Sequence, residues 1–236
     1  MSLPLVNTAK FSVKLPGCGL NVEYRPFFVK EQKVLMQATE SEDPAQITLA
    51  TADMIKACTF NELDVDDLTS TDVEYLLLKI RSKSVGEKTK IGLKCKHCET
   101  SNEIEMDLSK IEPKGDAVEE QKISINDKIG VAFRMPTIGK LRSFMEVSGG
   151  TATDTLIATM AAAVEYVYDA ESVYPSKEQK PEEIIQFLES LSTEQFKHIQ
   201  SAFDNFPRLM EEISFKCKSC GEENNFQLGG LSDFLG

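Results

Sequence analysis

Two segments of the chain alternate apolar and polar residues around a short turn and then end in proline. The first, FSVKLPGCGLNVEYRP (11–26), turns at Pro-Gly-Cys-Gly, and the second, KISINDKIGVAFRMP (122–136), turns at Asn126-Asp127. Alternation on both sides of turn-forming residues is typical of a β-hairpin with one buried face. We therefore predict a hairpin at each place, the first closed by Tyr24-Arg25-Pro26.

Each predicted hairpin is followed by segments whose apolar residues recur at helical spacing, with charged residues between them. The predicted helices cover residues 29–39, 43–58 and 69–83 after the first hairpin, and 138–148, 153–171, 180–191 and 192–206 after the second. Asp43 before Pro44, and Ser192, are residues that favour helix starts. The segment TDTLIATMAAAVEYVYDAE (153–171) is interpreted as one long helix rich in small residues.

Each series of helices runs into an apolar strand and a Cys-x-x-Cys turn. LKCKHCETSNEIEMDL (93–108) and FKCKSCGEENNFQL (215–228) share the order apolar, Lys, Cys, Lys, any residue, Cys, polar turn residues including Asn, then a strand-like alternation. The chain thus repeats one layout: hairpin, helices, strand, cysteine turn, strand. Only the cysteine turns match residue by residue, so coincidence of common elements remains the alternative.

The predicted fold is α+β, with two pseudo-repeated halves of hairpin, helices and CxxC knuckle joined by a four-cysteine zinc ribbon. The first half covers residues 1–110 and the second 122–236. The polar stretch between them, 111–121, contains Pro and Gly and no periodicity, which is typical of a linker. The knuckles at 91–108 and 213–228 are predicted to form the single ribbon.

Four thiolates at this spacing match the requirement of a structural zinc ion, which one Cys-x-x-Cys turn meets only by half. The predicted ligands of one zinc per chain are Cys95, Cys98, Cys217 and Cys220. Closing a loop of roughly 120 residues costs about 4 kcal/mol of chain entropy, whereas structural zinc contributes on the order of 10–16 kcal/mol. Metal binding therefore outweighs loop closure. A site closed by four protein ligands leaves no position for a reacting water.

Other interpretations of these cysteines fit the pattern less well. A redox pair lies at the start of a helix after a strand, whereas both pairs here have strand-like residues on each side. His97 lies between the two ligands of the first turn, where its ring is expected to face water. Cys18 and Cys58 are isolated, and each is interpreted as a small apolar or turn residue.

The composition restricts the partners. The 236 residues carry a formal net charge of −12, which argues against non-specific binding of nucleic acid or anionic membranes. No apolar run approaches the ~20 residues that cross a bilayer, and the N-terminus lacks the features of a signal peptide. We expect a protein that works inside a cell, without a membrane or small-molecule substrate.

No enzyme motif is found. The chain lacks a glycine-rich phosphate loop, His-Glu-x-x-His and Gly-x-Ser-x-Gly. Its two histidines, His97 and His198, offer little for a Ser/His or Cys/His centre. We therefore predict a protein without catalytic residues.

Several segments together resemble the T4-type bacteriophage baseplate hub assembly protein family. They are VEYRPFFVKEQKVLMQA (22–38), LTSTDVEYLLLKIRSKSVGE (68–87), KCKHC and the ending CKSCGEENNFQLGGLSDFLG. The resemblance covers most of the chain from about Leu5 and is thinnest at 110–121 and 171–180. It implies a non-enzymatic structural or chaperone-like protein that helps to build the hub of a contractile phage tail in the host cytoplasm. Whether such a protein then stays in the virion tail baseplate is left open. Its cysteine pattern maps onto the four ligands already named.

Partner contacts with other hub or tail proteins are predicted from physical character alone. The C-terminal tail holds more apolar side chains than it can bury by itself, and Tyr24 and Arg25 are a second candidate contact. The tail residues are Phe226, Leu228, Leu231, Phe234 and Leu235. There are two alternatives: the tail packs back on its own domain beside the zinc, and Arg25 bridges the two halves through an acidic helix end. The rival function is a zinc-ribbon nucleic-acid-binding or transcription-accessory factor, which requires a basic and aromatic surface around the ribbon.

Overall fold

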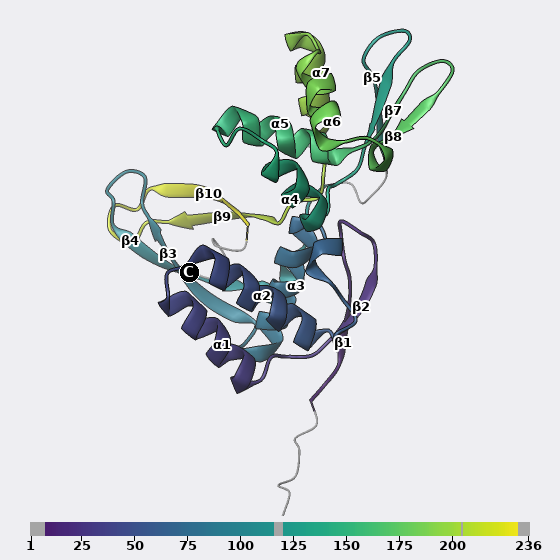
Figure 1. The fold of residues 1–236 in the computed structure, drawn as a ribbon. Helices are drawn as coiled ribbons and strands as arrows, with labels where there is room; N and C mark the ends of the chain where they lie inside the picture. Colours follow the sequence, from purple (N-terminus) through teal and green to yellow (C-terminus); the bar gives the residue numbers. More distant parts are fainter. Residues whose placement is uncertain (1–7, 116–119, 204, 231–236) are drawn as a thin grey trace, which may run out of the picture. The chain divides into compact units, whose positions relative to one another are not determined.

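The structure, a computed structural model, describes residues 8–115, 120–203 and 205–230 (Figure 1). Contacts between residues divide the chain into two compact units. Unit 2 consists of Asp66–Ser70 and Gly115–Pro207, and unit 1 consists of the remaining chain. Unit 2 is therefore inserted, in sequence, between two parts of unit 1. The mixed α+β class predicted from the sequence is confirmed.

Among the described residues, unit 1 contains three antiparallel hairpins and three α-helices, as the hydrophobic pattern predicts. In chain order its elements are β1 (Phe11–Lys14), β2 (Asn21–Tyr24), α1 (Val29–Glu40), α2 (Pro44–Cys58), α3 (Ser70–Ser84), β3 (Lys88–Lys94), β4 (Ser101–Asp107), β9 (Met210–Lys216) and β10 (Glu223–Gly229). The strands pair as β1 with β2, β3 with β4, and β9 with β10.

The core of unit 1 joins α3 to the two cysteine hairpins. Tyr75 and Leu78 of α3 pack with apolar residues from β3, β4 and β10. The buried members of this cluster are Tyr75, Leu78, Ile91, Met106, Leu108, Ile111, Leu209 and Leu228. Residues separated by more than a hundred positions thus share one apolar interior, which brings the β3–β4 and β9–β10 hairpins together (Figure 1).

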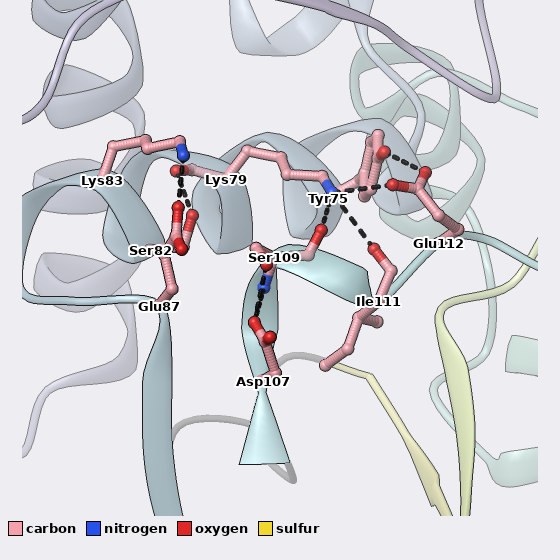
Figure 2. Close-up of polar contacts among 9 residues, drawn as sticks. All are labelled: Tyr75, Lys79, Ser82, Lys83, Glu87, Asp107, Ser109, Ile111 and Glu112. Carbon is pink, nitrogen blue, oxygen red and sulfur yellow. Dashed lines mark hydrogen bonds and ion pairs between the residues drawn. The ribbon is translucent and has the colours of Figure 1, made fainter.

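A half-buried lysine, Lys79, fixes the chain after β4 against α3 (Figure 2). Lys79 Nζ donates to the carbonyl oxygens of Ser109 at 3.0 Å and Ile111 at 3.3 Å, and it pairs with Glu112 Oε1 at 2.8 Å. The hydroxyl of Tyr75, one turn earlier on α3, donates to the other oxygen of Glu112. All three N–H donors of the Lys79 ammonium have a hydrogen-bond partner. Helix α3 thus holds residues 109–112, the segment that follows β4.

In the part of the chain that the structure describes, unit 2 is a four-stranded antiparallel sheet with four α-helices. Its elements are β5 (Gln121–Ser124), β6 (Gly130–Phe133), α4 (Ile138–Glu146), α5 (Ala152–Ala163), β7 (Val164–Tyr168), β8 (Val173–Pro175), α6 (Pro181–Glu189) and α7 (Thr193–Phe203). Phe133 lies fully buried in its core beside α5 and α7 residues. The predicted cap of α7 is confirmed, because Ser192 Oγ accepts the N–H of Gln195 at 3.2 Å.

The long helix predicted at 153–171 is wrong in its second half. α5 ends at Ala163, and the chain continues as β7, which pairs with β6. The segment Val-Glu-Tyr-Val-Tyr alternates β-branched and aromatic residues, which favour a strand when a partner edge is present. Tyr166 and Tyr168 contact each other on one face of this strand, with ring centroids 6.0 Å apart. Tertiary pairing with β6 therefore overrides the helical pattern.

The compact units do not coincide with the two predicted halves. Ile111, at the start of the predicted linker, is 2% exposed and belongs to the core of unit 1. Lys114 forms an isolated antiparallel bridge with Arg208, where the chain re-enters unit 1. The second cysteine hairpin thus packs with unit 1 rather than with the residues that precede it in sequence. The pseudo-repeat itself stays a prediction.

Candidate metal centre

The first cysteine turn connects β3 to β4. The N–H of Cys95 donates to the carbonyl of Thr100 at 3.0 Å, and the N–H of Glu99 returns to the carbonyl of Cys95 at 3.0 Å. Glu99 has a φ of 58°, a left-handed conformation that closes the turn. The turn aims both thiols of its Cys-x-x-Cys to one side.

The second turn, between β9 and β10, repeats this hydrogen bonding. The N–H of Cys217 donates to the carbonyl of Glu222 at 2.9 Å, and that of Gly221 returns to Cys217 at 2.9 Å. Gly221 occupies the position of Glu99 and has a φ of 75°, where glycine carries no steric cost. The two turns therefore have the same backbone design with different residues.

The four thiols predicted as ligands lie in one cluster. The Sγ atoms of Cys95 and Cys220 are 3.7 Å apart, and those of Cys98 and Cys217 are 3.6 Å apart. All four sulfurs lie within 4.8 Å of one another. Zn–S bonds of about 2.3 Å in a tetrahedron place neighbouring sulfurs about 3.8 Å apart. Both the donor set and the spacing therefore fit a tetrahedral zinc ion.

Backbone N–H groups donate to the sulfur of the first cysteine in each turn. His97 N–H points to Cys95 Sγ and Ser219 N–H points to Cys217 Sγ, each at 3.4 Å. N–H donors stabilise a thiolate more than a thiol. The N–H groups of Cys220 and Ser219 accordingly lower the pKa of Cys217 to about 6.

The two cysteines outside the cluster show the opposite effect. Burial raises the pKa of Cys58 to about 11, and burial also raises that of Cys18 to about 11. Both thiols therefore stay protonated at neutral pH. Cys58 is buried and Cys18 is half-buried. The His97 side chain is exposed, as expected.

Sequence reasoning missed two residues of the site, Asn102 and Asn224. Each is almost fully buried, and each directs its carboxamide at the cysteine turn of the other hairpin. Asn102 Nδ2 lies 3.6 Å from Cys217 Sγ, and Asn224 Nδ2 lies 3.4 Å from Cys95 Sγ. The signal was present in the repeat, since each asparagine stands four positions after the second cysteine of its turn.

Two predicted contact residues, Tyr24 and Arg25, are buried within unit 1. Arg25 Nη2 pairs with Glu31 Oε1 at 2.9 Å, at the first turn of α1. Arg25 therefore pairs with an acidic helix end, but it does not bridge the two predicted halves as the alternative supposed, since the helix and the arginine belong to the same unit. The burial argues against an exposed partner contact at this place.

The predicted contact tail lies mostly beyond the residues that the structure describes, since Leu231, Phe234 and Leu235 are outside them. Leu228 is buried in the core of unit 1, as the packing alternative supposes. Phe226 is half-buried and stacks on Phe215 with ring centroids 5.9 Å apart.

Comparison with known proteins places the geometry in context. A family model described as T4 bacteriophage base plate protein matches residues 7–236. No curated protein and no solved structure matches the chain. Within the described residues, no helix is long and apolar enough to cross a membrane.

Proposed function

Because the chain belongs to the T4 bacteriophage base plate protein family, we propose that it is a zinc-stabilised assembly protein of the baseplate hub. Family membership gives it a structural role in a phage baseplate. The finer proposal is that it acts in the host cytoplasm, chaperone-like, through contacts with other hub or tail proteins. In this proposal the metal has no catalytic task, because four sulfur ligands would close its coordination sphere.

The observation that carries the zinc proposal is the convergence of two thiol pairs separated by 119 positions. Zinc at this place would tie the C-terminal hairpin to the rest of unit 1. Removing one ligand would leave a site that binds the ion weakly. The hairpin β9–β10 would then lose its metal-mediated link to the hairpin β3–β4. The metal is thus proposed to stabilise a platform and to take no part in chemistry.

Metal analysis tests the site directly. The purified chain should contain about one zinc ion per molecule. Cys217→Ser should lose it, whereas Cys18→Ser, the same chemical change outside the cluster, should retain it. A chain purified without zinc that also fails to bind added zinc would refute the proposal, as would full retention by Cys217→Ser.

Hub assembly is tested in infected cells. A phage lacking this gene should form no complete baseplate hub, and wild-type protein supplied in trans should restore it, whereas Cys217→Ser should not. Mass spectrometry of mature virions then separates a protein that stays in the tail from one that leaves. Normal hubs in the absence of the protein would refute an assembly role.

The nucleic-acid alternative finds little support at the ribbon. Lys88 pairs with Glu105 at 2.7 Å and Lys90 with Glu103 at 3.1 Å, both across the β3–β4 hairpin. These lysines are balanced by carboxylates, whereas phosphate binding requires a continuous basic surface. Partner contact through Phe226 and the residues after Leu228 remains our proposal for how the protein binds other hub components.

A further inference from the structure

The carboxamide of Asn102 spans the two hairpins. It stands on β4, yet its Oδ1 accepts the N–H of Lys218, in the opposite cysteine turn, at 2.9 Å. Its Nδ2 donates to Cys217 Sγ at 3.6 Å and to the carbonyl of Thr100 on its own hairpin at 2.8 Å. The side chain thus contacts the backbone of both turns and one of the sulfurs.

Asn224 makes the same contacts in the opposite direction. From β10 its Oδ1 accepts the N–H of Lys96 at 2.9 Å, and its Nδ2 donates to Cys95 Sγ at 3.4 Å and to the carbonyl of Glu222 at 3.0 Å. Each asparagine therefore holds the first cysteine of the other hairpin. The pair is reciprocal, in the way that a two-fold symmetric interface is.

The orientation of both carboxamides is determined by their partners. A backbone N–H can donate only to the oxygen of a carboxamide, so Oδ1 must face the N–H of Lys218 or Lys96. Nδ2 must then face the sulfur and a carbonyl oxygen. Asn102 is 3% exposed and Asn224 is 1% exposed, so water does not compete for these contacts. Each carboxamide makes three hydrogen bonds, one through Oδ1 and two through Nδ2, which fix its orientation.

We propose that Asn102 and Asn224 are positioning residues of the metal centre, forming a reciprocal clamp that holds the two half-sites in register for one metal ion. This inference rests on the proposed zinc site. Groups that donate to a ligand atom orient it and favour its metal-binding form, and their loss typically costs 10- to 100-fold in metal affinity. The clamp also explains why the asparagine recurs at the same place in both copies of the repeat.

Alanine substitution tests the clamp. We expect Asn102→Ala and Asn224→Ala to keep one zinc site and the absorption spectrum of tetrahedral four-sulfur Co²⁺, but to lower zinc affinity roughly 10- to 100-fold in competition with a chromophoric chelator. Asn225→Ala is the matched control, because its exposed side chain is next to Asn224 and points away from the sulfurs. Equal zinc affinity in all three variants would overturn the clamp.

An aspartate variant separates the clamp from a merely structural role. Asp at position 102 has nearly the shape of Asn and still accepts the N–H of Lys218, but it presents a negative oxygen to the sulfur. The clamp predicts that Asn102→Asp binds zinc no better than Asn102→Ala, although its shape is better preserved. Recovery of wild-type affinity in Asn102→Asp would show that only the acceptor matters and would overturn the proposal.

Measurement on the unmodified chain covers the case in which the variants do not fold. In protein loaded with ¹¹³Cd, the Nδ2 protons of Asn102 and Asn224 should show coupling to the metal through the sulfur, and its absence would refute the clamp. Failure of the two proposals is distinguishable: if Cys217→Ser retains zinc, the site itself is wrong, whereas loss in Cys217→Ser with unchanged Asn variants refutes only the clamp.

Discussion

Replacing Arg25 by Met should strongly destabilise unit 1, because it leaves a buried carboxylate without its counter-charge. The side chains of Arg25 and Glu31 are 9% and 7% exposed, and their charged atoms are 2.9 Å apart. Glu31 also accepts the N–H of Phe28 through its other oxygen at 2.7 Å, so it cannot turn away to water without opening the start of α1. Met keeps the length of the aliphatic stem and removes only the guanidinium.

The expected magnitude follows from this burial. Removing one partner of a buried ion pair costs about 3–5 kcal/mol, because the remaining charge stays desolvated. Lys30 provides a control on the same carboxylate: its Nζ lies 3.6 Å from Glu31 Oε1, but its side chain is 75% exposed. An exposed ion pair contributes roughly 0–1 kcal/mol. Lys30→Met should therefore change the stability of unit 1 very little.

The assay is urea unfolding of the zinc-loaded chain followed by circular dichroism, with hydrogen exchange of α1 peptides assigning the transition to unit 1. A double variant, Arg25→Met with Glu31→Gln, should be more stable than Arg25→Met alone, since Gln can still accept from Phe28 and carries no charge. A loss below about 1 kcal/mol for Arg25→Met, or equal losses for Arg25→Met and Lys30→Met, would refute the reasoning.

Two further predictions concern the same unit. Lys79→Met should cost about 1–3 kcal/mol, because the carbonyl oxygens of Ser109 and Ile111 lose their half-buried donor (Figure 2). Lys83→Met, on the same helix but more exposed, should cost less than about 1 kcal/mol in the same urea assay, and equal costs would contradict the assignment. Burial alone would raise the pKa of Glu31. The hydrogen bonds from Arg25 and the Phe28 N–H have the larger combined effect, so the pKa of Glu31 lies below its usual value. The stabilisation by this pair is then present above the ordinary pKa of about 4.5 and lost as the pH falls through the lower folded pKa. The stability gap between wild type and Arg25→Met should accordingly narrow as urea titrations are moved from neutral pH to about pH 3, and a gap that widens would contradict it.

Local patterns predicted most elements of the fold, since hairpins and amphipathic helices are specified over short stretches of sequence. The exceptions are β7, where Val164 to Tyr168 form a strand paired with β6, and β8, which pairs with β7 in turn. A helix and a strand compete on nearly equal terms for such a segment, and the distant partner decides. The assignment of the second cysteine hairpin to unit 1 has the same cause, because it depends on packing against α3.

Site prediction succeeded where chemistry depends on spacing and failed where it depends on burial. The Cys-x-x-Cys spacing identified all four clustered thiols. Asn102 and Asn224 occupy the same position after each cysteine turn, so the sequence shows that they recur. Their role depends on which hairpin each side chain contacts, and the sequence alone does not show that. Arg25 was predicted as an exposed contact because it is a charged residue beside Pro26. The sequence does not show that the Glu31 carboxylate pairs with it in the interior.

The insertion of unit 2 between the two cysteine turns has a consequence for synthesis of the chain. The ribosome incorporates Cys98 and then adds 118 residues before it reaches Cys217, which takes about 6–24 s at typical bacterial elongation rates. During that time the nascent chain carries only the first pair of clustered thiols, Cys95 and Cys98. Unit 2 is therefore translated in full before the second pair, Cys217 and Cys220, can join them.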